Sequence, residues 1–157
     1  KKFWNETRLG KAKQIGLSPN QVVALAAIVQ KETVKIEERP RVAGVYMNRY
    51  HKNMKLQADP TVVYAVKKAS GVQLKRVLNK HLTIDSKYNT YLHTGLPPGP
   101  IAMPDISSID AVLNYEKHDY YYFVADVKKA GYHKFAKTLR QHNINAAEYR
   151  RWVSKIH

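Results

Sequence analysis

The strongest constraint on the fold is a six-residue stretch, residues 95–100, that contains three prolines and two glycines. Proline has a fixed φ and no main-chain N–H, and glycine is conformationally loose, so this stretch can form neither a helix nor a central strand. It must be a stiff, irregular loop. Hydrophobic periodicity also weakens around it, from residue 75 to residue 104.

Helical patterns precede this region. Ser18 and Gln21 can form a capping box with Pro19 in the first helical position, which predicts that a helix begins here. Two further helices are expected, over residues 40–50 and 61–68, and Asp59 is the predicted cap of the second. The first helix is expected to reach about residue 37, because apolar residues recur at helical spacing at Val22, Leu25, Val29 and Ile36.

The segments after the loop predict both helix and sheet. Residues 108–116 are expected to form a short helix. Residues 120–125 are aromatic and β-favouring, which predicts a strand paired with residues 131–135 in a hairpin. Asn145 and Glu148 form a second capping pair, so the last helix is expected to begin at Asn145. Helices around a small antiparallel sheet define an α+β fold, and residues 1–157 have the length of one domain.

The chain carries a formal net charge of +15, from 27 Lys and Arg against 12 Asp and Glu. Such a charge attracts polyanions, which include nucleic acid, anionic lipid and acidic cell-wall polymer, and charge alone does not choose among them. The basic residues are spread along the chain rather than gathered in one recognition helix, so no specific binding of nucleic acid is expected.

Several classes of site are not expected from the sequence. The chain has no cysteine, which excludes disulfides and thiol nucleophiles. It has no His-Glu-x-x-His motif and no glycine-rich phosphate loop, so we expect neither a metal nor a cofactor. No stretch reaches the roughly 20 apolar residues that a membrane-spanning helix needs.

Glu32 is anomalous because it falls on the apolar stripe of the first predicted helix, between Val29 and Ile36. A carboxylate in apolar surroundings loses hydration, so its pKa should rise from about 4.3 to roughly 6–7, the range that a general acid needs near neutral pH. The alternative is a structural glutamate that pairs with an arginine such as Arg49. The helical pattern by itself favours this alternative.

Asp59 and two loop segments have open interpretations. Asp59 could be the second carboxylate of a two-carboxylate glycosidase, although its position before Pro60 favours a helix cap. Residues 88–91 and 95–101 could line a groove, because rigid loops hold binding groups at little entropic cost. An ordinary proline-stiffened connection explains these two segments equally well.

Five segments of the chain match, in order, the conserved segments of one known family, and they are residues 25–33, 45–49, 56–62, 88–101 and 122–143. Through these segments the chain resembles the endolytic murein transglycosylase (YceG-like) family, and the similarity covers about residues 18–149. Two positions depart from the family pattern, since Ala27 replaces a serine and Gln30 replaces the first of two glutamates. The second glutamate, the catalytic residue of the family, is retained as Glu32, so the resemblance selects the catalytic interpretation.

The resemblance implies a lytic transglycosylase, which cleaves the β-1,4 bond between N-acetylmuramic acid and N-acetylglucosamine without water and leaves a 1,6-anhydro end. Glu32 would donate a proton to the leaving oxygen and then accept one from the C6 hydroxyl, with no cofactor and no second carboxylate. Glu38 could support Glu32 indirectly. The expected substrate-binding residues are Asn48, Arg49, Gln57, Asp59, Tyr88, Asn89, Thr90, Tyr91, Pro97 and Pro98.

The resemblance also implies a location and partners. Members of the family are anchored in the cytoplasmic membrane with the catalytic part outside it, and they release or terminate nascent glycan strands beside peptidoglycan synthases. We therefore expect glycan strands as substrate, synthases as partners and an N-terminal anchor outside this sequence. Two rivals are a lysozyme-like hydrolase, in which Asp59 or another acid activates water, and a non-catalytic module that binds polyanions.

Overall fold

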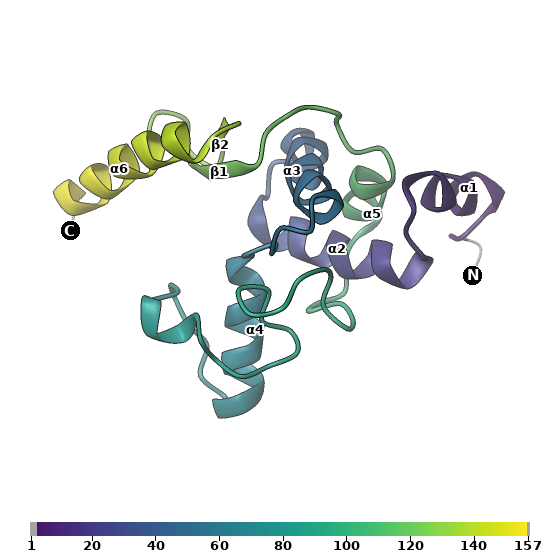
Figure 1. Cartoon of the computed structure of the whole chain (residues 1–157), viewed down its shortest axis with the longest axis horizontal. Coiled ribbons are helices and arrows are strands. Elements are labelled where there is room, and N and C mark those ends of the chain that lie inside the picture. Colours follow the sequence, from purple (N-terminus) through teal and green to yellow (C-terminus); the bar gives the residue numbers. More distant parts are fainter. Residues whose placement is uncertain (1–2, 157) are drawn as a thin grey trace.

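The computed structural model describes residues 3–156 as six α-helices and one two-stranded antiparallel sheet (Figure 1), which confirms the α+β class. The helices are α1 (Glu6–Ile15), α2 (Pro19–Glu32), α3 (Arg39–His51), α4 (Asp59–Ser70), α5 (Ile106–Leu113) and α6 (Leu139–Ile156). The strands are β1 (Tyr122–Ala125) and β2 (His133–Ala136), and two 3-10 helices are η1 (Ile36–Glu38) and η2 (Asn79–His81).

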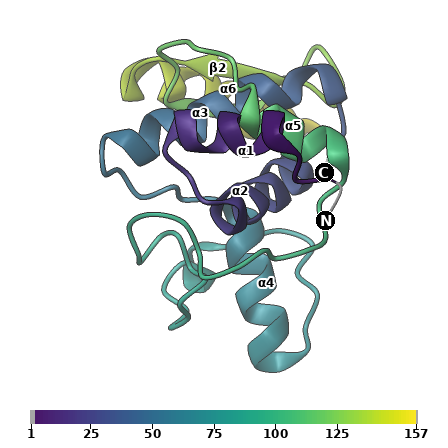
Figure 2. The same cartoon turned by 90° about the vertical axis from the view of Figure 1, so that its right-hand side faces the viewer.

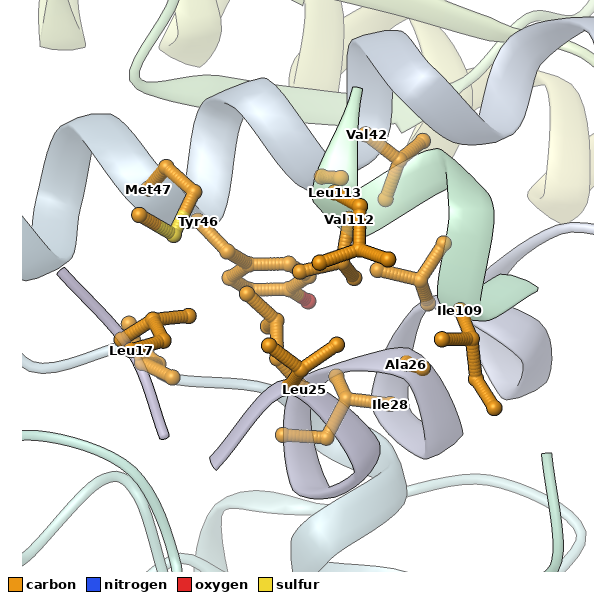
Figure 3. Close-up of a cluster of buried hydrophobic side chains, with 14 of the residues drawn as sticks. Leu17, Leu25, Ala26, Ile28, Val42, Tyr46, Met47, Ile109, Val112 and Leu113 are labelled. Carbon is orange, nitrogen blue, oxygen red and sulfur yellow. The ribbon is translucent and has the colours of Figure 1, made fainter. Parts of the chain in front are cut away.

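The core lies where α2 packs against α3 and α5 (Figure 2). Figure 3 shows Leu25 and Ile28 of α2 beside Tyr46 of α3 and Val112 of α5. Every residue of α2 from Ala24 to Val29 is buried, so the middle of this helix is apolar on all sides. Full burial of a large apolar side chain contributes roughly 1.5–3 kcal/mol, and this group of three helices is therefore the rigid centre on which the site is built.

Two smaller units extend from this centre (Figure 1). One is α4 with the irregular segment that follows it. The other is the hairpin of β1 and β2, against which α6 packs, and in which Phe123 lies opposite Phe135. No helix within residues 3–156 is long and apolar enough to cross a membrane.

The predicted start of α2 is confirmed. The Ser18 hydroxyl accepts a hydrogen bond from the Gln21 N–H at 3.2 Å, and the Gln21 side chain accepts one from the Ser18 N–H at 2.9 Å. These two bonds satisfy main-chain donors that a helix start leaves unpaired.

The predicted end of α2, near residue 37, is wrong. The helix ends at Glu32, because Thr33 adopts an extended conformation and its hydroxyl accepts a hydrogen bond from the Lys35 N–H at 3.1 Å. A threonine side chain that binds the local backbone competes with helix continuation. Ile36 therefore leaves the apolar stripe on which it was expected, and it is 61% exposed.

The predicted cap of α4 is also wrong. Asp59 is the first residue of the helix, and the preceding Ala58 occupies the cap position without a side-chain hydrogen bond. The Asp59 carboxylate instead accepts a hydrogen bond from the Tyr91 hydroxyl at 2.5 Å. Asp59 is thus free of a capping role and faces a side chain 32 residues away.

The last two helices begin earlier than predicted. Helix α6 begins at Leu139, where the Thr138 hydroxyl accepts a hydrogen bond from the Gln141 N–H at 3.1 Å. Asn145 is buried inside this helix, and Glu148 pairs with Lys134 of β2. The short helix expected at residues 108–116 is α5, Ile106–Leu113, because the Asp105 side chain caps it. Both strands of the hairpin form within about two residues of their predicted limits.

Candidate active site

Glu32 ends helix α2 at the point where α3 and the start of α4 approach it. The side chain is partly buried, and Tyr46 of α3 donates a hydrogen bond from its hydroxyl to Oε2 of Glu32. Tyr46 is 2% exposed, and its ring packs edge-on against Phe123 of β1 with 5.8 Å between the ring centroids. Three elements therefore fix the position of the carboxyl group.

The surroundings of Glu32 raise the pKa of its carboxyl from 4.5 to about 7. Burial is the largest cause, because the charged form loses hydration. The hydrogen bond from Tyr46 lowers this pKa, the charge of Asp59 raises it, and His133 lowers it. At neutral pH the group can therefore both hold and release a proton, which is the requirement for general acid and base catalysis by one residue.

Arg49 is not the partner of Glu32. Its Nε donates a hydrogen bond to the Tyr121 carbonyl and its Nη1 donates one to the Lys55 carbonyl, both at 2.7 Å. Glu32 makes no salt bridge with any residue in the part of the chain that the structure describes. The interpretation of Glu32 as a structural ion-pair residue is thus contradicted.

Asp59 is the second carboxylate of the site. Its charge acts on the pKa of Glu32, and its partner Tyr91 has a pKa raised above the ordinary value by burial and by the Asp59 hydrogen bond. Tyr91 consequently keeps its proton and acts as a donor to Asp59. An arrangement of two carboxyl groups, one with a raised pKa, is typical of enzymes that cleave glycosidic bonds.

Thr90 positions the segment that carries Asp59. Its hydroxyl accepts a hydrogen bond from the Ala58 N–H at 2.8 Å and lies 2.9 Å from the Thr61 hydroxyl. Its carbonyl accepts a hydrogen bond from the N–H of Gln57, which has a left-handed φ of +49°. Such a conformation is uncommon for a residue other than glycine and persists only where surrounding contacts impose it.

Asn89 has a similar supporting role. It is fully buried, and its side-chain amide donates hydrogen bonds to the carbonyls of Leu82 and Ile84, both at 2.9 Å. Its side-chain oxygen accepts a hydrogen bond from the Tyr91 N–H at 2.9 Å. Asn89 and Thr90, both predicted to bind substrate, therefore use their side chains to hold the loop around Tyr91.

Glu32 and Asp59 lie at the junction of two cavities, and each of them lines both, as does Tyr149 of α6. We call the first cavity the aromatic arm. It has a volume of about 680 Å³ and lies between α3, the hairpin and α6. Its lining includes Tyr46, Tyr91, Tyr121, Tyr122, Phe123, His133 and His142.

We call the second cavity the cationic arm. It has a volume of about 1310 Å³ and lies between α4, residues 73–79 and the C-terminal half of α6. The basic side chains in its lining are Lys31, Lys67, Lys68, Lys75, Arg76 and Arg150. The two arms share Glu32, Asp59 and Tyr149 in their linings, and we refer to both arms together as the cleft.

The structure brings some of the predicted substrate-binding residues to this cleft and not others. Arg49, Gln57, Asp59 and Tyr91 line the aromatic arm together with Glu32. The residues that line neither arm are Asn48, Tyr88, Asn89, Thr90, Pro97 and Pro98.

Contacts elsewhere explain why some residues lie outside the cleft. The Asn48 side chain donates hydrogen bonds to the carbonyls of His118 and Tyr120, at 2.8 and 2.9 Å, and so holds the segment that leads into β1. Tyr88 packs against Tyr64 of α4, with 4.8 Å between ring centroids. Asn48 and Tyr88 therefore support the elements that form the walls of the cleft but do not line it.

Sequence reasoning named Glu38 as an indirect support of Glu32 but missed its pairing with His133. His133 lines the aromatic arm, and its Nδ1 lies 2.6 Å from a carboxylate oxygen of the buried Glu38. The other oxygen of Glu38 accepts a hydrogen bond from the His133 N–H at 2.8 Å. The two residues are 95 positions apart, so no local pattern signals the pair. In residues 3–156, no group of three or more His, Asp or Glu side chains has an arrangement suited to a metal ion.

Known proteins resemble this chain in sequence and in structure. The endolytic murein transglycosylase of Bacillus subtilis (strain 168) is 42% identical over 144 residues, which are 92% of this chain and 38% of that protein. The protein of the same name from Streptococcus pneumoniae serotype 2 (strain D39 / NCTC 7466) is 36% identical over 138 residues, 87% of this chain and 25% of that protein.

The fold has a counterpart in the crystal structure of a putative yceG-like protein from Listeria monocytogenes. The two match with a TM-score of 0.78 at 39% sequence identity, over 88% of this chain and 43% of that one. The chain thus spans less than half the length of each of these relatives. Because the YceG-like family pattern matches residues 1–148, nearly the whole sequence, the chain belongs to the YceG-like family.

Proposed function

We propose that this chain is the catalytic domain of an endolytic peptidoglycan lytic transglycosylase, with Glu32 as its acid and base. The observation that carries the proposal is a carboxyl group with a pKa of about 7 that lines two adjoining cavities. The names of the relatives supply the substrate, the glycan strand of murein. Murein lies outside the cytoplasmic membrane, so we place the activity there.

The proposed reaction needs one carboxyl group and no water. Protonated Glu32 donates its proton to the oxygen that links C1 of N-acetylmuramic acid to N-acetylglucosamine, and the C1–O bond breaks. The resulting Glu32 carboxylate then removes the proton from the C6 hydroxyl of the same muramic acid while O6 bonds to C1. The products are a 1,6-anhydro end and a free 4-hydroxyl, and Glu32 is protonated again.

The neighbours of Glu32 fit this cycle. The Tyr46 hydroxyl has a pKa raised well above its ordinary value, so it remains a donor and can stabilise the carboxylate that forms after the first proton transfer. The negative charge of Asp59 lies on the same cavity and can stabilise positive charge that develops on the sugar ring. His133, held by Glu38, borders the same space.

The shape of the cleft fits cleavage within a strand. A polymer bound in the aromatic arm can pass Glu32 and continue into the cationic arm, because both cavities reach this residue. The aromatic arm offers rings of Tyr91, Tyr122 and Phe123, whose faces suit the C–H faces of sugars. Internal bonds are thereby accessible without a free chain end.

Mass spectrometry of digested sacculi tests the proposal. The wild type should release fragments with 1,6-anhydromuramic acid ends, and Glu32→Gln should release none while keeping its circular dichroism spectrum. Glu37→Gln is the matched control, since Glu37 is exposed and lines neither arm. Normal release of anhydro fragments by Glu32→Gln would refute the assignment.

The position of Asp59 favours one rival, a lysozyme-like hydrolase in which Asp59 activates water. That enzyme would leave a reducing end that is heavier than the anhydro end by one water. The same mass spectra therefore separate the two reactions. A non-catalytic polyanion-binding module would instead release no fragments, and its binding would survive Glu32→Gln.

A further inference from the structure

One face of α4 lines the cationic arm along nearly the whole helix. Its side chains recur at the spacing that places residues on one side of a helix. The character of the face changes along its length: it is apolar next to Asp59 and basic in the last turn. Lys67 lies about 12 Å along the helix from Asp59, at a rise of 1.5 Å per residue. The lining residues of α4 are Asp59, Pro60, Val63, Tyr64, Lys67 and Lys68.

Basic side chains from three other segments face the same cavity. Lys75 and Arg76 follow α4, Arg150 belongs to α6 and Lys31 precedes the catalytic glutamate. Among residues 3–156, the carboxylates in the lining are Glu32 and Asp59, at the inner end. None of the six basic residues forms a salt bridge with a carboxylate in residues 3–156. The outer part of the arm is therefore a region of uncompensated positive charge.

Local helix stability explains only part of this arrangement. Basic residues in the last turn of a helix interact favourably with its dipole, which accounts for Lys67 and Lys68. It does not account for Lys75, Arg76 and Arg150, which reach the cavity from other segments. Like charges on facing walls of one cleft repel each other, and a bound anion would relieve this repulsion.

We propose that the cationic arm is a subsite for the carboxylates of the stem peptides on the glycan strand. This inference rests on the proposed function, because it takes the strand to pass Glu32. The sugar backbone of the strand offers no charge between its glycosidic bonds, whereas each stem peptide carries carboxylates. Lysine is a flexible point charge with three donors, so it suits carboxylates whose positions vary along a polymer.

The test compares two triple variants that lose the same charge. The arm variant is Lys67→Gln, Lys68→Gln and Arg76→Gln. The control variant is Lys13→Gln, Lys117→Gln and Lys128→Gln, at exposed residues that line neither arm, and Lys13 also occupies a last helical turn. Each is assayed for kcat/KM on glycan strands with stem peptides and on the same strands after an amidase has removed the peptides.

The wild type should prefer the peptide-bearing strands by about tenfold, the order expected for a few exposed charge contacts. The preference should reside in KM, fall with added salt and be retained by the control variant. The arm variant should lose most of it. An arm variant that keeps the wild-type preference overturns the inference, as does a control variant that loses it equally.

A second probe separates the peptides from other anions on the wall. Phosphate groups of an attached wall polymer are removed by hydrogen fluoride, which leaves the stem peptides in place. If hydrogen fluoride treatment lowers the wild-type kcat/KM on these strands about tenfold and amidase treatment does not lower it, the ligand is phosphate and the assignment to stem peptides is wrong.

Binding in a Glu32→Gln background keeps this inference distinct from the proposed reaction. Co-sedimentation with intact and with peptide-free sacculi measures how strongly the cationic arm binds stem peptides when no cleavage takes place. Weaker binding of the arm variant to intact sacculi, together with wild-type enzyme that releases no anhydro ends, supports the subsite and refutes the reaction. Unchanged binding of the arm variant, together with normal release of anhydro ends by the wild type, supports the reaction and refutes the subsite.

Discussion

The Tyr46 hydroxyl donates a hydrogen bond to the carboxyl group of Glu32, whose pKa is also influenced by the charge of Asp59. These two neighbours act in opposite directions, because the hydrogen bond favours the carboxylate and the nearby negative charge disfavours it. Burial raises the pKa of Glu32 by more than the hydrogen bond lowers it. The pKa therefore stays above its ordinary value of 4.5, at about 7.

The pH dependence of catalysis should follow this balance. The reaction begins with protonated Glu32, so the rate should fall as the pH rises through about 7. Tyr46→Phe removes the hydrogen bond that lowers this pKa, and its falling limb should move to higher pH. Asp59→Asn removes the charge that raises the pKa, and its limb should move to lower pH. Profiles of kcat/KM check both, and movement of the two limbs in the same direction contradicts the scheme.

The same pKa predicts a pH-dependent change in stability. The folded state binds the Glu32 proton more tightly than the unfolded chain, with pKa values of about 7 and 4.5. The stabilising contribution of this proton is complete below pH 4.5 and is lost as the pH rises through 7. Glutamine does not ionise, so Glu32→Gln should exceed the wild type in free energy of unfolding above pH 7, by about 3 kcal/mol. Urea denaturation at acidic and basic pH checks this, and an equal difference at both would contradict it.

Thr90 should matter for both stability and substrate binding. Thr90→Val leaves the buried Ala58 N–H without an acceptor, which should cost about 1–3 kcal/mol and loosen the segment that carries Gln57 and Asp59. We expect a higher KM, measured on purified glycan strands. Thr90→Ser keeps the hydroxyl, so it should retain most of the stability and the substrate affinity of the wild type. If Thr90→Ser is as impaired as Thr90→Val, the hydrogen bond is not the cause.

Substitution of glycine by alanine should have opposite effects on stability at Gly44 and at Gly10. Gly44 of α3 faces the segment before β1, and a Cβ there would lie 2.6 Å from Nε2 of His118. Gly44→Ala should therefore destabilise the protein by about 1–3 kcal/mol. Gly10 of α1 has no atom within 4 Å of such a Cβ, so Gly10→Ala should stabilise by about 0.5–1 kcal/mol. Thermal denaturation gives both signs, and a stabilising Gly44→Ala would show that the 116–118 segment shifts at no cost.

The elements that could be predicted from the sequence are those with strong local signals. The capping box at Ser18 fixes the start of α2, and the β-favouring residues 120–125 mark the hairpin. Helix α1 was not predicted, because it contains Gly10 and buries only Ala12, so it shows no apolar stripe. The end of α2 depends on the hydroxyl of Thr33, a contact that hydrophobic periodicity does not register.

The site was only partly predictable for a related reason. Glu32 stands out by its place among apolar residues, and the family resemblance selects the catalytic interpretation. Its pKa, however, also depends on Tyr46 and Asp59, which the fold brings from α3 and α4. The pairing of Glu38 with His133 joins segments that are 95 residues apart. The basic residues of the cationic arm are likewise scattered in the sequence, so a spread of charge along the chain did not reveal that six of them converge.

Helix α6 rests on a hairpin whose strands contain only four residues each, and it supplies one wall to both arms of the cleft. The opposite walls belong to α3 and α4, which are joined to the buried core through α2. The width of both arms therefore depends on how α6 packs against the hairpin, and not on the core alone. A substitution that shifts α6 on the hairpin is expected to change the aromatic arm and the cationic arm together, while the packing of α2, α3 and α5 is kept.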